Sequence, residues 1–453
     1  MMENRKFDVI VAGAGPAGFC AAIAAARMKS RVLLAENSDS ILGNLTSGPL
    51  EAIMTFHDEK RQVVKGIAEE FVSRCRREQG SLGHIEDTTG YAKTITPFSP
   101  EICKCVGFEM LSEAGVEILL QVYLKNCTVE EGHIKNLEIG DRNESRIYEA
   151  AVFIDCTGDG DLAAMAGAGF HMGDAKGAVQ PMTSLVQLGG VDTALLAEEA
   201  VGHPEEFSFF SETAYENMKK RTAENESQTL HLWGFGSLLE EGYKTGALSL
   251  KRQEMHVITG YQPGEAILNF TRADGNPLHM ADRSRAQLKT VIQGFELWKW
   301  LKKRHPAFKD SYLVKTGRIG IREGRRVDGH HCITRAELEE GGVKEHSVAM
   351  GAFPMDIHSP GGESMEYYTV NRGYQIPLES LAARDLDNLL AAGRCICCTH
   401  EAQGSLRITA TAMATGHGAG VCAALASRDK RACISVNYEE LKKNLLAQDA
   451  VVE

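Results

Sequence analysis

The sequence predicts an α/β fold, in which a parallel sheet binds a dinucleotide and a second, α+β domain is inserted. The first observation is an apolar run at residues 7–12 that leads directly into a glycine-rich turn, Gly13-Ala14-Gly15-Pro16-Ala17-Gly18. The second is the alanine-rich stretch to Arg27, which is typical of a helix. The third is another apolar run, at residues 31–35, that ends at Glu36. Strand, tight glycine turn, helix, second strand and acid in this order indicate a dinucleotide site.

The glycines of this turn each have a physical role. Gly13 allows the sharp turn, Gly15 lets the backbone approach a pyrophosphate, and Gly18 lets the helix pack on the strand. The phosphates would then lie at the positive end of the helix dipole. Glu36 falls about twenty residues after the turn, where an acid binds the ribose hydroxyls and argues against a 2′-phosphorylated cofactor. The alternative is a glycine-rich turn that binds nothing.

Length and composition indicate an ordinary globular protein of two domains. The chain has 453 residues, 43% hydrophobic and 24% charged, and exceeds the size at which one hydrophobic core stops growing. Its 49 basic and 61 acidic residues give a formal charge of −12, and no basic block with interleaved aromatics occurs, so nucleic acid is not an expected partner. No stretch reaches the ~20 apolar residues that cross a bilayer, and the first strand begins too early for a signal peptide. We expect a cytoplasmic protein whose 12 cysteines are reduced and mostly buried.

After the first nucleotide unit, the chain alternates between helical and strand patterns. Helices are predicted at residues 64–79 and at 99–114, where Ser99 is a candidate cap. Short strands are predicted at residues 116–122, 124–129, 134–139 and 147–154, as a small sheet inserted in the nucleotide domain. A buried-type strand at 151–156 then stops at Thr157-Gly158-Asp159, as strands do at the carboxyl edge of a parallel sheet.

The middle of the chain has a different character, and the nucleotide-domain pattern returns after it. Helices are predicted at 193–231 and 283–304, between short strand-like runs. An apolar run at 386–392 ends at Gly393-Arg394, and Gly404-Ser405 precedes a predicted helix to about residue 426. We therefore predict a discontinuous nucleotide domain at residues 1–170 and 373–430, a substrate domain at 171–372, and a tail at 431–453 that forms a surface helix.

The Gly13 turn, the Thr157-Gly158 loop and residues 393–406 can meet in one sheet. Their spacing resembles the glutathione-reductase-type FAD fold, in which the first segment binds pyrophosphate, the second lies near the cofactor, and the third directs a helix N-terminus at the flavin pyrimidine ring. Four runs, at residues 154–161, 320–326, 356–358 and 392–407, are similar to the bacterial FAD-dependent oxidoreductase family. The resemblance covers most of residues 7–426 and is specific for the family, but not for a reaction.

The resemblance implies a Rossmann-like FAD-binding domain of the glutathione-reductase type, with an inserted α+β substrate domain and noncovalently held FAD. The residues that it implies at FAD are Gly13, Ala14, Gly15, Pro16, Ala17, Gly18, Glu36, Asn37, Gly43, Asn44, Leu124, Thr157, Gly158, Asp159, Gly393, Arg394, Gly404, Ser405 and Leu406.

Two residues depart from the pattern of the family. Asn44 replaces a second glycine after Leu42-Gly43, which affects how closely this loop can approach the cofactor. Arg394 occupies a position where the wider fold often has an acid. Its planar guanidinium suits a phosphate, and the alternative is a surface or interdomain ion pair.

Several electron-transfer motifs are absent from the sequence. No cysteine pair occurs at residues 42–50, which argues against a dithiol–disulfide reductase, and no second glycine fingerprint for NAD(P)H of comparable quality occurs. Electrons are expected to pass through a substrate, an external electron carrier, oxygen or a quinone. Cys395, Cys397 and Cys398 lack iron–sulfur spacing and are interpreted as packing residues, with a redox thiol near the flavin as the alternative. His330-His331-Cys332 predicts no metal site, because adjacent histidines on a strand point to opposite faces.

Two histidines are candidates for the proton transfer that accompanies hydride transfer. His400 lies just before the helix that is expected to point at the flavin; alternatively, it orients its loop. His358 follows Asp356 on a predicted strand, where the aspartate would fix the tautomer of the histidine. An Asp–His pair on an ordinary edge strand, without a role in catalysis, would show the same pattern.

Arginines are the candidates for substrate binding. Arg322, Arg325 and Arg326 crowd one turn with Glu323 and Asp328, a pattern that suits either a carboxylate clamp or a solvated ion-pair network. We expect Arg322 or Arg326 to face the flavin. Arg407 is a further candidate for anion binding.

We therefore predict an FAD-dependent oxidoreductase, a dehydrogenase or oxidase that transfers hydride between a small polar metabolite and noncovalently bound flavin. Proton abstraction would be the role of His400 or His358. One alternative is a reductase of a double bond that uses an external electron donor, in which an arginine of residues 322–326 delivers the proton. Another is a non-catalytic FAD-binding protein.

Overall fold

A seven-stranded sheet carries the predicted dinucleotide turn at the end of a parallel strand. The computed structural model describes residues 5–50, 52–359, 365–370 and 372–453. The sheet has the order β6 (Glu117–Leu119), β2 (Val32–Ala35), β1 (Lys6–Ala12), β9 (Ser145–Asp155), β8 (His133–Gly140) and β7 (Tyr123–Glu130), with β21 (Leu389–Ala391) beside β9. The pairs β1–β2, β1–β9, β2–β6 and β9–β21 are parallel. The predicted α/β class and parallel sheet are confirmed.

Strands β7, β8 and β9 belong to this sheet, which corrects the prediction of a separate small sheet. They pair antiparallel in chain order, and β9 then pairs with β1 over residues 149–155. The 11 residues of β9 are enough for both neighbours, because its first half pairs with β8 and its second half lies between β1 and β21.

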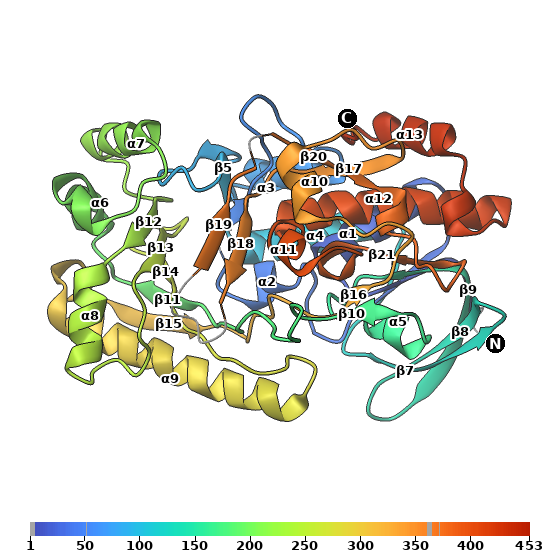
Figure 1. The fold of residues 1–453 in the computed structure, drawn as a ribbon, viewed down its shortest axis with the longest axis horizontal. Coiled ribbons are helices and arrows are strands. Elements are labelled where there is room, and N and C mark those ends of the chain that lie inside the picture. Colours follow the sequence, from blue (N-terminus) through green and yellow to red (C-terminus); the bar gives the residue numbers. More distant parts are fainter. Residues whose placement is uncertain (1–4, 51, 360–364, 371) are drawn as a thin grey trace.

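Helices α1 (Pro16–Arg27) and α12 (Thr409–Asp429) lie side by side against the sheet (Figure 1). Small residues permit this close packing: a Cβ on Gly416 would lie 2.0 Å from the carbonyl oxygen of Ala17, and one on Gly420 would lie 2.3 Å from that of Ala21. The alanine- and glycine-rich composition of both helices is thus a packing requirement. It fixes the N-terminus of α12 relative to the glycine turn.

The helix predicted after Gly404-Ser405 exists as α12, but a second, shorter helix that was not predicted precedes it. Helix α11 (His400–Leu406) already contains Gly404 and Ser405, and α12 begins at Thr409. Thr399 caps α11 through its side chain. The backbone of Ile408 is extended (φ −73°, ψ 147°), which ends one set of helical hydrogen bonds before the next begins.

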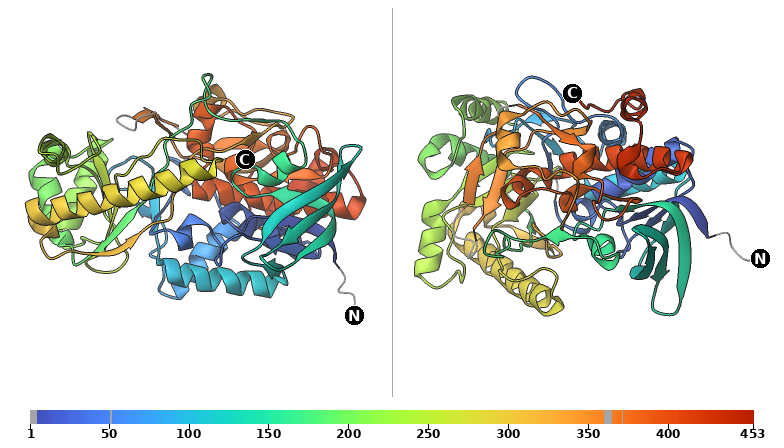
Figure 2. Two further views of the ribbon diagram at one scale, coloured as in Figure 1. Left: turned by 90° about the horizontal axis from the view of Figure 1, so that it is seen from below. Right: turned by 45° about the vertical axis from the view of Figure 1, so that its right-hand side comes forward.

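A five-stranded antiparallel sheet lies at the other end of the molecule, with the long helix α9 along it (Figures 1 and 2). Its order is β12 (His231–Gly234), β13 (Met255–Thr259), β14 (Ala266–Asn269), β11 (Val186–Gly189) and β15 (Tyr312–Thr316). This sheet has a hydrophobic core of its own, to which Leu297 and Leu301 of α9 (Met280–Arg304) contribute. Residues 193–231, predicted as helical, contain α6 (Thr193–Gly202), the 3-10 helix η1 (Pro204–Glu206), α7 (Glu212–Ala223) and the first residue of β12.

Smaller elements connect the two sheets. The remaining strands form β3 (Ala52–Met54) with β5 (Thr94–Pro97) and β4 (Ile85–Glu86), β10 (Phe170–His171) with β16 (Arg326–Val327), β17 (Ser347–Gly351) with β20 (Tyr374–Pro377), and β18 (Met355–His358) with β19 (Met365–Tyr368). The remaining helices are α2 (Asn44–Ser47), α3 (Ile67–Arg77), α4 (Pro100–Ala114), α5 (Asp161–Met165), α8 (Gly236–Lys244), α10 (Arg335–Glu340) and α13 (Tyr438–Ala447), with 3-10 turns η2 (Pro306–Phe308), η3 (Leu378–Ser380), η4 (Gly393–Cys395) and η5 (Cys433–Ser435).

The C-terminal tail packs on the main core through one face. Leu441 and Leu445 of α13 are buried, and so is Val452 after it, so the predicted surface helix is amphipathic. All 12 cysteines are free thiols and most are buried, including Cys395, Cys397 and Cys398. Among the described residues, no helix combines the length and apolar character that a membrane crossing requires.

Candidate active site and cofactor cradle

The turn between β1 and α1 combines tight packing with open space. Gly13 has a φ of +93°, and a Cβ there would lie 2.5 Å from the carbonyl oxygen of Cys156. A Cβ on Gly18 would lie 1.8 Å from the carbonyl oxygen of Gly13, so both positions require glycine. At Gly15, by contrast, no described atom beyond its chain neighbours lies within 4 Å of the Cβ position. The space next to the Cα of Gly15, which a side chain would fill, is therefore free.

The start of α1 can accept an anion. Gly15 is the N-cap, Pro16 follows, and in the described structure no side chain caps the first turn. The N–H groups of this turn and the positive end of the helix dipole are therefore available to a ligand. These are the features that a dinucleotide pyrophosphate requires.

Glu36 lies beside this turn, where the sequence predicts the ribose acid. One carboxylate oxygen accepts a hydrogen bond from the backbone N–H of Ala14 (2.7 Å), and the other accepts one from that of Ser38 (2.9 Å). The next residue, Asn37, is exposed. Leu124 lies apart from these contacts: it pairs with Ile139 in β7–β8 and packs on a hydrophobic cluster of that sheet.

The second predicted segment begins where β9 ends. The fully buried Asp155 accepts hydrogen bonds from the N–H (3.0 Å) and hydroxyl (2.7 Å) of Thr157 and from the N–H of Ala163 (2.8 Å). Burial raises the pKa of Asp155, against the effect of these hydrogen bonds. They hold the loop Thr157-Gly158-Asp159 next to Cys156, and hence next to the Gly13 turn.

Arg394 joins the second and third segments. Its guanidinium donates to the carbonyl oxygens of Gly158 (2.8 Å) and Ile321 (2.7 Å) and pairs with the Asp159 carboxylate (2.7 Å). The ion pair that was the alternative to a phosphate contact therefore exists. Gly393, with a φ of +80°, would bring a Cβ within 3.0 Å of the Cβ of Ala17, so the third segment also reaches the glycine turn.

The loop that contains Asn44, where the sequence departs from the family pattern, also contacts the Gly13–Gly18 turn. The N–H of Leu42 donates to the carbonyl oxygen of Ala14 (2.6 Å), and a Cβ on Gly43 would lie 3.6 Å from the Cα of Gly15. Asn44 begins α2 and lines the adjacent cavity. The loop thus approaches the turn closely despite the asparagine, since Gly43 provides the required backbone freedom at φ +54°.

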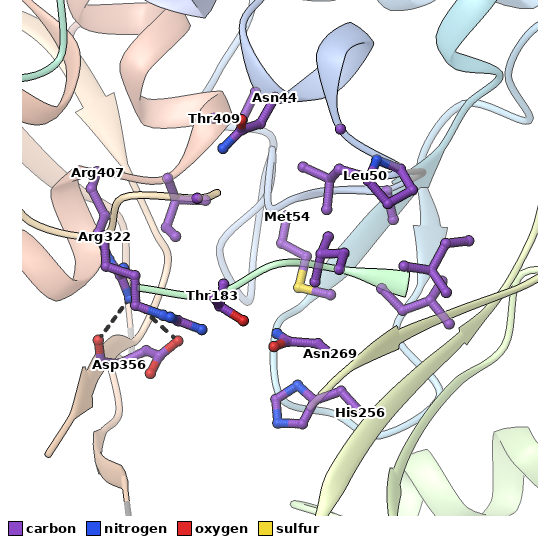
Figure 3. Close-up of a pocket in the computed structure, with 18 of the residues that line it drawn as sticks. Asn44, Leu50, Met54, Thr183, His256, Asn269, Arg322, Asp356, Arg407 and Thr409 are labelled. Carbon is purple, nitrogen blue, oxygen red and sulfur yellow. Dashed lines mark hydrogen bonds and ion pairs between the residues drawn. The ribbon is translucent and has the colours of Figure 1, made fainter. Parts of the chain in front are cut away.

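A cavity of about 310 Å³ opens between the start of α12 and the five-stranded sheet (Figure 3). Asn44 and Thr409 lie at one end, His256 and Asn269 lie at the other, and Arg322, Arg407 and Asp356 form one side, as Figure 3 shows. The polar lining residues are Asn44, Tyr91, Thr183, His231, His256, Asn269, Arg318, Arg322, Asp356, His358, Arg394, Arg407 and Thr409. Apolar side chains complete the wall, among them Leu50, Met54, Leu185, Ile258 and Ile267.

Asp356 of β18 is the acidic residue that lines this cavity. Arg407 Nη2 lies 3.1 Å from its carbonyl oxygen and 3.6 Å from its carboxylate, and His358 Nε2 lies 3.0 Å from the other carboxylate oxygen. Burial alone would raise the pKa of Asp356, but His358, Arg407 and Arg322 hold it far below its usual range. The carboxylate therefore stays ionised.

His358 has both ring nitrogens engaged. Nδ1 lies 3.3 Å from Nη2 of Arg272, which can only donate, so the proton of the neutral ring is on Nε2 and faces Asp356. Burial and the charge of Arg322 lower the pKa of His358 well below its ordinary value. The predicted Asp356–His358 pair exists, but its histidine has no nitrogen left for a substrate.

A second acid–histidine pair, not predicted from the sequence, reaches the same cavity. Asp87 Oδ1 lies 3.0 Å from Nδ1 of His231, and both side chains are buried. Asp87 also accepts hydrogen bonds from Thr89 and from the N–H of Ala92. With Nδ1 facing a carboxylate, the proton of the neutral ring is on Nδ1, which leaves the Nε2 lone pair free. Nε2 of His231 has no hydrogen-bond partner among the described residues, and His231 lines the cavity.

His256 lies next to this pair. Its ring packs on Trp233 with a centroid distance of 3.6 Å and an interplanar angle of 41°, and its Nε2 is likewise without a hydrogen-bond partner in the described part of the chain. Burial lowers the pKa of His256 well below its ordinary value, so its ring is neutral. No spacing signal could have indicated these residues, because Asp87 and His231 are 144 positions apart.

His400 and Arg326 form a different cluster, which does not line the cavity. Both bind the fully buried Glu323: His400 Nδ1 lies 2.9 Å from its carboxylate, and Arg326 forms an ion pair with it. Burial would lower the pKa of His400, but Glu323 raises it. Arg325 pairs with Asp161 (2.9 Å). The three predicted clamp arginines thus separate, and only Arg322 lines the cavity.

Gly404, Ser405 and Leu406 are buried inside α11 and do not line the cavity. A Cβ on Gly404 would lie 2.8 Å from the carbonyl oxygen of Asp356, and the Ser405 hydroxyl lies 2.6 Å from that of Tyr374. These residues support β18, while Thr409 provides the helix start at the cavity. Among the residues that the structure describes, no group of three or more His, Cys, Asp or Glu side chains could hold a metal ion.

Comparisons with known proteins agree on a family. The sequence model of the family described as FAD dependent oxidoreductase matches residues 8–445. No curated protein matches the sequence.

The similar solved structures share little sequence with this chain. A geranylgeranyl bacteriochlorophyll reductase-like protein from Thermoplasma acidophilum has a TM-score of 0.48 at 13% identity, over 99% of this chain and 84% of the other. A flavoprotein/dehydrogenase from Cytophaga hutchinsonii has a TM-score of 0.48 at 12% identity, over 98% and 84%. The p-nitrophenol 4-monooxygenase from Pseudomonas putida has a TM-score of 0.46 at 10% identity, over 99% and 84%.

Proposed function

The chain belongs to the FAD dependent oxidoreductase family, and on this premise we propose that it is a dehydrogenase or oxidase of a small polar organic metabolite. In this proposal FAD is held noncovalently and accepts hydride from the metabolite. The observation that carries the proposal is the cavity of about 310 Å³, which is lined at once by Asn44, from the loop that contacts the glycine turn, and by His231 of the buried acid–histidine pair.

The residues around the glycine turn fit FAD. We assign the pyrophosphate to the open backbone at Gly15 and the uncapped start of α1, and the ribose to Glu36. The loop at Gly43 and Asn44 leads from there into the cavity, where the start of α12 at Thr409 would face the flavin. The antiparallel run β7–β8–β9 that returns to the parallel sheet supports the glutathione-reductase type of FAD domain.

His231 is the proposed base. When bound, FAD supplies reversible acceptance of a hydride from a carbon of the substrate. A hydroxyl or amine on that carbon must lose a proton as the hydride leaves, and His231, a lining residue of the cavity, has a buried Nε2 without a hydrogen-bond partner among the described residues. Asp87 fixes the ring tautomer and stabilises the imidazolium that forms.

The histidines that the sequence favours take other roles in this proposal. His358 uses one nitrogen for Asp356 and faces Arg272 with the other, so it orients the carboxylate that lies between Arg322 and Arg407. His400 binds Glu323 away from the cavity and holds the start of α11. Both are positioning residues.

Reduction of a double bond with an external electron donor is the second candidate function. One observation favours it: burial and neighbouring charges lower the pKa of Arg322, in the cavity wall, to about 9. Arg322 lies in the cavity wall, where the reductive reaction would require a proton donor. Family membership favours either reaction over a non-catalytic FAD-binding protein.

An anaerobic metabolite screen tests the proposal. The FAD-loaded protein is mixed with alcohols, amines and hydroxy acids, and loss of the visible flavin absorbance identifies a reductant. Reoxidation by air then indicates an oxidase, whereas a reduced protein that is stable in air indicates a dehydrogenase with a quinone or a protein carrier as acceptor. Reoxidation of chemically reduced protein by unsaturated compounds alone would favour the second candidate. Purified protein that is colourless and takes up no FAD would overturn both.

A further inference from the structure

Four arginines are buried beside the cavity, and they outnumber the carboxylates that face them. We propose that the substrate is an organic acid whose carboxylate binds Arg322 and Arg407. The inference rests on the proposed function, because it names the chemical class of the substrate of that same cavity.

The first observation behind the proposal is an excess of buried positive charge. Arg252 and Arg322 are each 8% exposed, Arg272 is 2% exposed, and the Arg407 side chain is 8% exposed. The ionised carboxylate among them is that of Asp356, and Glu254 is the further acid that faces Arg252. Buried guanidiniums without enough counter-charge are costly, so this arrangement favours a bound anion.

The second observation is that several arginine nitrogens donate no hydrogen bond to the described residues. Nε of Arg407, Nε of Arg272, and Nε and Nη1 of Arg252 are buried without a hydrogen-bond partner among the described residues. Arg322 donates through Nη1 to the carbonyl oxygen of Pro181. Arg322 and Arg407 line the cavity and lie next to each other beside Asp356 (Figure 3), while Arg252 and Arg272 add their charge from behind the wall. A planar carboxylate matches the geometry of guanidinium donors.

The phosphates of FAD do not account for this charge. The proposed pyrophosphate position is at Gly15 and the start of α1, and no residue of the Gly13–Gly18 turn lines the cavity among those described. Asn44 lies between the two regions, at the end of the cavity opposite His256 in Figure 3. The arginines therefore face the substrate end of the site.

The apolar residues that line the cavity indicate the character of the rest of the substrate. Leu50 and Met54 lie across the cavity from Arg322 and Arg407 in Figure 3, and Leu185, Ile258 and Ile267 are further apolar lining residues. A carbon chain would lie against these residues, with its oxidisable carbon near His231. The class of ligand is thus a small organic acid with a short apolar skeleton, not a neutral alcohol or a cation.

Binding by the oxidised holoprotein tests the inference without turnover. Acetate, propionate, butyrate and pentanoate are titrated at neutral pH against propionamide and butyramide as neutral analogues. Two measurements are made: the change in the visible flavin spectrum and the shift in Tm. We expect saturable binding of the acids, tighter for the longer ones, and none of the amides at the same concentrations.

Variants identify the binding groups. Arg322→Met and Arg407→Met are each expected to weaken acid binding about tenfold to a hundredfold, the range for hydrogen bonds to a charged group. Arg407→Lys keeps the charge and should recover part of the affinity. Arg304→Met is the matched control, because it removes one arginine charge at the exposed end of α9.

The outcomes separate this inference from the proposed function. Equal binding of acids and amides by the wild-type holoprotein, or none of either, would overturn the inference even if every arginine variant failed to fold. So would arginine variants that shift the flavin reduction potential but leave acid binding intact, since the arginines would then serve the flavin. Acid binding with no metabolite able to reduce the flavin would leave the inference standing and contradict the proposed function.

Discussion

Asp87 Oδ1 and His231 Nδ1 lie 3.0 Å apart, and the side chains of both residues are less than 2% exposed. The two residues come from different parts of the chain: Asp87 follows β4, and His231 begins β12 of the five-stranded sheet. Because the carboxylate fixes one ring nitrogen, the other keeps a lone pair, which has no hydrogen-bond partner among the described residues, and His231 itself lines the cavity. This relationship makes His231 the testable centre of the proposed chemistry.

Removing this base should slow the reaction without releasing the cofactor. For His231→Gln we expect the rate of flavin reduction by the metabolite found in the screen to fall about 10²–10⁴-fold, the usual contribution of a general base. Stopped-flow absorbance measures the rate, and the visible spectrum of the purified protein measures FAD content. His203→Gln, an exposed histidine of the same region, is the control. An unchanged rate in His231→Gln would remove this histidine from the mechanism.

Two glycines of the dinucleotide turn should respond differently to alanine. In Gly18→Ala the new Cβ meets the Gly13 carbonyl oxygen at 1.8 Å, so we expect destabilisation of about 3 kcal/mol or more in urea unfolding of the apoprotein. In Gly15→Ala the Cβ enters free space, so apoprotein stability should change by less than about 0.5 kcal/mol. FAD affinity of Gly15→Ala should nevertheless fall at least about tenfold, because the methyl group occupies the side assigned to the pyrophosphate. Unchanged FAD affinity would argue against that assignment.

The role of Arg394 can be tested as either a structural ion pair with Asp159 or a contact with a phosphate of the cofactor. Its side chain is 21% exposed and that of Asp159 is 14% exposed, so the pair is partly shielded from water. We expect Arg394→Met to destabilise the apoprotein by about 2 kcal/mol through loss of charged hydrogen bonds, with a similar effect for Asp159→Asn. Urea unfolding without FAD measures both. A Met variant with normal apoprotein stability but weak FAD binding would favour the phosphate contact instead.

The buried His417 predicts a loss of stability in acid. Burial lowers its pKa from 6.5 to about 4, so the folded protein holds a neutral ring while the unfolded chain binds a proton between these values. Stability is therefore fully present above about pH 6.5 and falls as the pH drops to about 4, by about 3 kcal/mol at 1.36 kcal/mol per pH unit. Unfolding curves at pH 7, 5.5 and 4.5 for wild type and His417→Gln measure this. In the variant, the free energy of unfolding should depend less steeply on pH. An equal pH dependence in the variant and the wild type would contradict the prediction.

Local patterns made the backbone around the glycine turn predictable. The glycine turn, the helix after it and Glu36 lie within about 25 positions, and their geometry depends on backbone rules that act over a few residues. Strand β9 and the loop at Thr157 were predictable for the same reason. The partner of β9 was not, because an 11-residue strand can pair with β8 and β1 at once, and sequence periodicity does not identify neighbours.

The substrate side required the tertiary structure. Arg322, Arg325 and Arg326 are neighbours in the sequence, but backbone direction sends them to the cavity, to Asp161 and to Glu323 respectively. His400 was predicted to lie just before a helix directed at the flavin, but it is the first residue of the separate helix α11, which ends at Leu406 before α12 begins at Thr409. The break at Ile408 has no glycine or proline to mark it.

By itself, the sequence predicted a dinucleotide site at Gly13–Gly18, an α/β fold and a resemblance to an FAD-dependent family, and the fold class and the family are confirmed. The tertiary structure alone decided that Asp87 pairs with His231, which lines the cavity. The reason is physical. Turns and helix starts are set by interactions between near neighbours in the chain, whereas a buried charge pair depends on elements more than a hundred positions apart meeting across a desolvated interface.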